Sequence, residues 1–139
     1  MSSLNIDFKT PISKLTDKHR IWFATALTAM ILVDGNIDRT EAEFLVKVIS
    51  IVKEENEVDR LKKFIQFKTV PQLSKPVGLD RKLAMTMLID MVRIAVVDKD
   101  FAASEEQMVR TVGETLGFAS AEVEKLVAFG FELMGKEAS

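Results

Sequence analysis

The sequence has no cysteine among its 139 residues, which excludes disulfides, thiolate nucleophiles and cysteine-bound zinc. Its single histidine, His19, is the only one available to a Ser–His–Asp triad, and no serine lies on a recognisable nucleophile elbow. The glycines lack both phosphate-loop and dinucleotide-binding spacing. We therefore expect a protein that is not an enzyme.

The sequence also has little net charge and no long hydrophobic run. A net charge of −2 and a pI near 5.5 create no strong field, so nucleic acid is not an expected partner. The most apolar stretch, residues 83–97, is interrupted by Asp90 and Arg93 and is short for a bilayer. Met1 to Thr10 carries no secretory signal pattern. We expect a soluble, cytoplasmic protein without stable membrane insertion.

The remaining composition is that of one globular domain over residues 1–139, with 47% hydrophobic and 29% charged residues. No segment alternates with period two, and apolar residues recur at helical spacing, which predicts an all-α fold of six to seven helices. We expect a loose N-terminal arm over 1–14 and a linker over 68–79, where Pro71, Pro76 and Gly78 lie. The predicted helices cover 17–34, 38–53, 56–67, 80–97, 104–116 and 120–135. A single long helix through Phe67 fits nearly as well as a break at 54–56.

Local signals mark several helix ends. Thr16 is a candidate N-cap for the first helix, and Asp80 opens the fourth. Gly117 followed by Phe118 predicts a helix stop whose next residue folds back on the last turn. In the third helix Arg60, Lys62 and Lys63 form a basic cluster, which we interpret as a solvated face with local ion pairs.

One junction between helices recurs along the chain. Residues 33–41, Val-Asp-Gly-Asn-Ile-Asp-Arg-Thr-Glu, are partly repeated 64 residues later as Val-Asp-Lys-Asp-Phe-Ala-Ala-Ser-Glu over 97–105. Core positions agree better than surface positions at this shift. The pattern predicts two helix–turn–helix units related by a pseudo-twofold axis.

The acids of these junctions are the candidate metal ligands. Asp34, Asn36 and Asp38 alternate like the first ligands of a calcium-binding loop, but Arg39 and Leu45 replace its essential glycine and glutamate. If the two junctions meet, Asp34, Glu41, Asp98 and Glu105 converge and need a divalent cation, with calcium, magnesium or manganese favoured over zinc. The alternative is that these acids only cap helices and interact with the helix dipoles.

The chain resembles the TerB-like family, helical domains linked to bacterial tellurite resistance. The resemblance rests on residues 33–41, on their degraded copy, and on Leu-Gly-Phe-Ala-Ser-Ala-Glu-Val over 116–123. It implies an all-helical, cytoplasmic protein with two internal repeats, a role in tellurite or stress response, and metal binding by Asp34, Glu41, Asp98 and Glu105. The second copy departs from the family pattern at Lys99 and Ala102.

Two further hypotheses do not need a metal. The protein can be an interaction scaffold that binds other proteins through an apolar groove, using exposed aromatics such as Phe64, Phe67, Phe129 or Phe131. The weaker option is a small-molecule or lipid site between the two methionine-rich central helices. The sequence predicts no oligomeric state.

Overall fold

The computed structural model describes residues 8–33, 39–95 and 103–138, and within these ranges the fold is all-α without strands, as predicted. Its elements are a 3₁₀ turn η1 (Ile12–Lys14), α1 (Asp17–Leu32), α2 (Arg39–Ile49), α3 (Glu55–Gln66), α4 (Arg81–Ala95), α5 (Ala103–Thr115) and α6 (Ser120–Ala138). α2 and α3 are separate helices, so the predicted break is confirmed, but it lies at 50–54 and not at 54–56, because α2 ends at Ile49 and α3 begins at Glu55. None of the described helices is long and apolar enough to cross a membrane.

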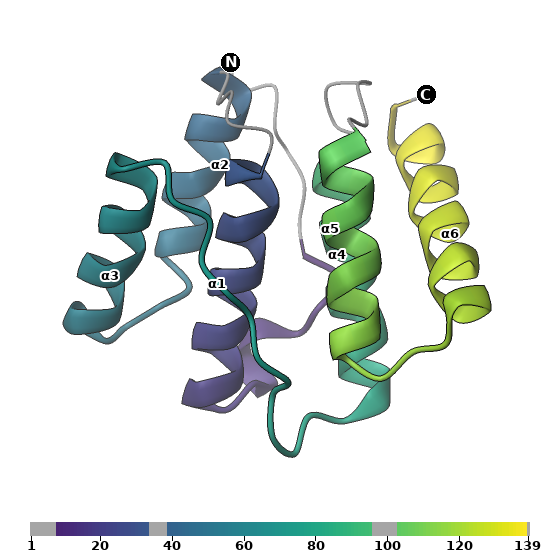
Figure 1. Ribbon diagram of the computed structural model, residues 1–139, viewed down its shortest axis with the longest axis horizontal. Helices are drawn as coiled ribbons and strands as arrows, with labels where there is room; N and C mark the ends of the chain where they lie inside the picture. The colour runs from purple at the N-terminus through teal and green to yellow at the C-terminus, as the bar shows by residue number, and fades with distance from the viewer. Residues whose placement is uncertain (1–7, 34–38, 96–102, 139) are drawn as a thin grey trace.

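The helices form a bundle with two distinct edges. Figure 1 shows α1 and the α4–α5 pair at the centre, α3 at one edge and α6 at the opposite edge. α1 and α4 run in the same direction, and α2 and α5 run back. The C-terminal ends of α1 and α4 and the N-terminal ends of α2 and α5 therefore lie at one end of the molecule (Figure 1).

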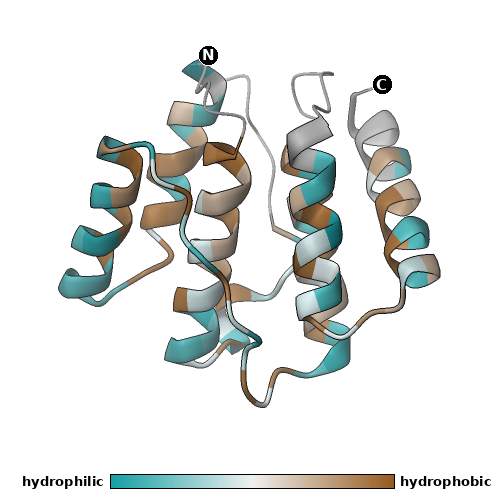
Figure 2. Ribbon diagram, in the orientation of Figure 1, coloured by the Kyte–Doolittle hydropathy of each residue, from teal (hydrophilic) through white to brown (hydrophobic). Residues whose placement is uncertain are grey.

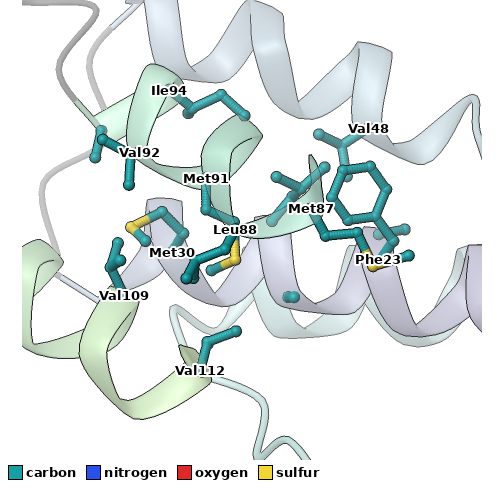
Figure 3. Close-up of a cluster of buried hydrophobic side chains, with 14 of the residues drawn as sticks. Phe23, Met30, Val48, Met87, Leu88, Met91, Val92, Ile94, Val109 and Val112 are labelled. Carbon is teal, nitrogen blue, oxygen red and sulfur yellow. The ribbon is translucent and has the colours of Figure 1, made fainter. Parts of the chain in front are cut away.

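The core lies between α1 and α4, whose apolar residues cover most of each helix surface. From Phe23 to Leu32 every residue of α1 is buried, including Thr25 and Thr28, which donate hydrogen bonds to backbone carbonyls one turn earlier. Met30, Met87 and Met91 are fully buried in this contact, and Val109 and Val112 of α5 complete it (Figure 3). A helix with apolar residues on most of its surface belongs in the interior of a bundle, and the sequences of α1 and α4 both have this pattern.

Three predicted helix ends are confirmed. The Thr16 side chain accepts a hydrogen bond from the His19 N–H at 3.1 Å, and the Asp80 carboxylate accepts one from the Lys82 N–H at 3.1 Å. Gly117 has a φ of +95°, and the buried Phe118 donates its N–H to the Gly113 carbonyl, closing α5. The predicted stop at Gly35 and cap at Asp38 lie outside the described residues.

Helix positions follow the 64-residue shift. α1 and α4 begin 64 residues apart, α2 and α5 also 64, and α3 and α6 65. Burial matches at aligned positions as well, for Leu27 and Met91 are both fully buried and Val48 and Val112 nearly so. These observations agree with the predicted duplication, which stays a prediction.

The N-terminal segment differs from the loose arm expected over 1–14. Residues 1–7 lie outside the described ranges, but from Phe8 onward the chain is packed against the bundle. The Phe8 ring lies edge-on to Phe23 and Phe44, with centroids 5.6 and 5.7 Å apart. Thr10 is 2% exposed and bonds to Asp90 of α4. We call residues 8–15 the N-terminal strap; it is held by partners that follow it in sequence, which local signals do not reveal.

Candidate functional site

The predicted metal ligands are only partly described. Asp34 and Asp98 lie outside the described residues, and Glu105 belongs to α5 but its side chain is also outside them. Glu41, in the first turn of α2, is buried at 6% exposure. Among described side chains no group of three or more acids and histidines is arranged to hold a metal ion. The convergence of these four acids therefore stays a prediction.

A buried polar network lies in the bundle interior. The Asp90 carboxylate of α4 accepts hydrogen bonds from the Lys9 and Thr10 N–H groups at 2.9 Å, from the Thr10 hydroxyl at 2.7 Å and from Arg93 at 3.0 Å. Burial raises the pKa of Asp90 above its ordinary value of 3.8, although each of these donors lowers it. Asp90 and Arg93 are 1% and 2% exposed, so this network fastens the N-terminal strap and presents nothing to a ligand.

The central methionines are buried as well. Met30, Met87 and Met91 are fully buried between α1 and α4, where the sequence raised the option of a small-molecule or lipid site. An open apolar depression of about 360 Å³ lies instead between residues 70–73 and one side of α5. Methionine in the central contact acts as a flexible filler of an irregular core.

The surface at α3 has a different character, because large apolar side chains remain exposed on it. Val46 of α2 is 70% exposed and Phe67, at the end of α3, is 69% exposed. Each lines an apolar depression of about 290 Å³ on one flank of α3. We call α3 with these two depressions the α3 edge, which Figure 1 shows at the margin of the bundle opposite α6.

The first depression is a groove between α2 and α3. Its lining residues are Ala42, Leu45, Val46, Ile49, Lys62, Ile65 and Gln66. Ala42, Val46 and Ile49 recur at i, i+4 and i+7, which forms a second apolar stripe on α2 beside the buried stripe of Phe44 and Val48. Ile49 is only partly buried and lines this groove.

The second depression, which we call the Phe64–Phe67 cleft, lies where α3 ends. It is lined by Arg60, Lys63, Phe64, Phe67 and Thr69. The helix closes with Lys68 at a φ of +53°, and the Thr69 N–H donates to the Phe64 carbonyl at 2.9 Å. This left-handed closing position is normally glycine, because a side chain there is strained.

The two charged residues that line this cleft, Arg60 and Lys63, are both basic. Arg60 is held in place by Glu57 at 2.7 Å and by the Thr25 hydroxyl at 2.9 Å, and its guanidinium lies 5.6 Å from the Phe64 ring centroid. Lys63 and Lys68 have no ion-pair partner among the described residues. The prediction of local ion pairs on this basic face therefore holds for Arg60 and not for Lys63.

The sequence predicted only part of the α3 edge. Phe64, Phe67, Phe129 and Phe131 were predicted to be exposed aromatics. Phe67 is exposed, and Phe129 and Phe131 of α6 are 47% and 43% exposed, whereas Phe64 is half-buried. Val46 was missed, although the spacing of Ala42, Val46 and Ile49 was a usable signal. Figure 2 shows why α3 is readable from sequence, since its hydrophilic residues face outward and its hydrophobic residues face α1 and α2.

Comparison with models of known protein families, with curated proteins and with solved structures found no match. The resemblance to TerB-like proteins therefore rests on the quoted residues alone.

Proposed function

We propose that this protein is a non-enzymatic protein-interaction module whose docking surface is the α3 edge. The observation that carries the proposal is the exposure of Val46 on α2 and of Phe67 at the end of α3, each beside an apolar depression that α3 borders. Exposed apolar groups that adjoin a groove are typical of surfaces that bind other proteins. The partner covers these side chains and gains the free energy of removing them from water.

Site-specific photo-crosslinking in the source cell tests this proposal. A photoreactive amino acid replaces Val46 or Phe67 in turn, and Val77 and Phe129 serve as matched apolar positions, 91% and 47% exposed, away from the α3 edge. We expect the same adduct from Val46 and Phe67 and none from the two controls. Adducts formed equally at all four positions, or at neither test position, contradict the proposal.

A second candidate function is the binding of a divalent cation in a tellurite or stress response, as the TerB-like resemblance implies. It is supported by the arrangement of the described helices, since the ends that flank both acidic junctions lie at one end of the bundle (Figure 1). Asp34, Glu41, Asp98 and Glu105 are the proposed ligands, and calcium, magnesium or manganese suits their oxygen atoms better than zinc does.

Isothermal titration with these four metals tests the second candidate. We expect saturable binding that the Asp34→Asn/Asp98→Asn double variant loses, because the amide removes ligand charge while keeping its size. Binding that is absent, or equal in the variant, means that the acids serve as helix caps only. Photo-crosslinking at the α3 edge is independent of this result.

A further inference from the structure

The geometry points to an acidic segment with a bulky apolar anchor as the partner of the Phe64–Phe67 cleft. This inference rests on the proposed docking function of the α3 edge and specifies the chemistry of its occupant. It is carried by three features of the cleft: its apolar volume, the sign of the charges around it, and the residue that closes α3.

The volume fits an anchor side chain. About 290 Å³ is at the lower limit of ligand-sized pockets, which span about 300–1,000 Å³. The walls are the Phe64 and Phe67 rings, and Phe67 leaves 69% of its surface in water. A single leucine, phenylalanine or methionine side chain from a partner buries these rings, as anchor residues do at the centre of interfaces.

The basic residues at the cleft predict the charge of the partner residues beside the anchor. Arg60 and Lys63 line the cleft and Lys68 lies between the lining residues Phe67 and Thr69. None of the described residues that line it is acidic. Arg60 already bonds to Glu57, whereas Lys63 and Lys68 have no ion-pair partner in the described part of the chain. Glutamate or aspartate on either side of the anchor supplies the missing charge, and a basic segment is repelled.

The end of α3 gives a further reason. Lys68 adopts a φ of +53°, a position where glycine removes the strain of a side chain. A lysine there adds a positive charge between the lining residues Phe67 and Thr69 at the expense of helix stability. The Lys68→Gly variant separates the two roles, because we expect it to unfold at a higher urea concentration than the wild type and to bind an acidic peptide more weakly.

Binding of short synthetic peptides to the full chain tests the inference. Three fluorescein-labelled peptides carry one central leucine flanked by glutamates, glutamines or lysines, and a fourth has alanine in place of leucine between glutamates. We expect fluorescence anisotropy at low salt to show about tenfold tighter binding of the glutamate–leucine peptide than of its glutamine version, weakening as salt rises. Shifted amide NMR signals should gather at residues 60–69.

Charge-reversal variants provide the matched control. Lys63→Glu/Lys68→Glu should reverse the preference, so that the lysine–leucine peptide binds best. Lys62→Glu changes an adjacent lysine that lines the α2–α3 groove instead, and should leave the preference for glutamate unchanged. Unfolding curves check that each variant is folded.

The failures of the two proposals are distinguishable. A photo-crosslink at Phe67 combined with equal or better binding of the glutamine or lysine peptide overturns the acidic partner and leaves the docking surface standing. Binding to phosphatidylserine vesicles that Lys63→Glu/Lys68→Glu abolishes, without binding of the glutamate–leucine peptide, shows a membrane contact and overturns the inference. A dimer in light scattering that Phe67→Asp dissolves assigns the cleft to a second copy and overturns it too.

Discussion

At the scale of single residues, Asp90 makes the longest-range polar contacts described in this protein. It lies in α4, and its carboxylate binds the N–H groups of Lys9 and Thr10, which precede it by 81 and 80 residues. A buried carboxylate is costly unless donors surround it, and here backbone, hydroxyl and guanidinium donors all do. The same interactions that solvate the charge therefore fasten the N-terminal strap.

Replacing Asp90 by alanine should destabilise the protein strongly. The Thr10 N–H and hydroxyl lose their acceptor in a buried site and the Lys9 N–H loses it in a partly buried one, and each unsatisfied buried group costs about 1–3 kcal/mol. We expect a loss of about 3 kcal/mol or more in the free energy of unfolding, measured with urea. Asp80→Ala, which removes one exposed cap bond, should cost only about 1 kcal/mol; equal losses would mean that the network is not the source.

The raised pKa of Asp90 predicts a pH dependence of stability. Because the folded state binds this proton more readily than the unfolded chain, the stabilisation is complete below pH 3.8 and is lost as the pH rises through the folded value. Asp90→Asn lacks this titration. In urea unfolding across the acidic pH range, the free energy of unfolding of Asp90→Asn should therefore increase relative to that of the wild type as the pH rises. A shift in favour of the wild type would mean that the hydrogen bonds outweigh desolvation.

At the scale of elements, close approach between helices depends on two helix-interior glycines. A Cβ atom added at Gly113 of α5 would lie 2.6 Å from a methyl carbon of Val123 in α6. One added at Gly130 of α6 would lie 2.5 Å from a methyl carbon of Val92 in α4. Glycine weakens an isolated helix relative to alanine, so these positions stabilise the protein only through the contacts between helices.

Gly113→Ala tests this balance. Alanine improves helix propensity by about 1 kcal/mol, but the clash with Val123 should cost more, giving a net loss of about 1–2 kcal/mol. In a Val123→Ala background both γ-methyl groups of Val123 are gone, and the same substitution should become neutral or stabilising. A double-mutant cycle by urea unfolding measures this coupling. Equal effects in both backgrounds would show that α5 and α6 do not meet closely at this point.

At the scale of the whole molecule, the two halves share one core. Phe23 and Leu27 of α1 belong to the same buried cluster as Met87 of α4 and Val109 of α5. The N-terminal strap adds a polar connection between the first segment and α4. The helix starts recur at a shift of 64 or 65 residues, but the buried cluster contains residues from both sets of three helices.

Separate halves should therefore fail to fold. We expect fragments 1–75 and 76–139 each to show little helical circular dichroism, whereas the full chain unfolds in one cooperative transition. Mixing the fragments should restore part of the signal, because the surfaces of α1 and α4 are complementary. A fragment with a cooperative transition of its own would show that the halves are independent domains.

Much of the fold was predictable because its signals are local. Thr16, Asp80 and the Gly117–Phe118 pair mark helix ends through interactions within one turn of the chain. Both aromatic residues of the Phe64–Phe67 cleft were predicted to be exposed, which is confirmed for Phe67 but not for the half-buried Phe64. The metal hypothesis rests on residues 34 and 98, which lie outside the described ranges, and it stays a prediction.

The sequence by itself determined where helices form, since helical spacing and capping depend on neighbours a few residues apart. Only the tertiary structure decided how Asp90, Gly113 and Val46 are used. Whether each of these residues stabilises the protein or forms a binding surface depends on residues far away in the chain. The physical reason is that burial, close approach and exposure are properties of the packed bundle, which no short stretch of sequence contains.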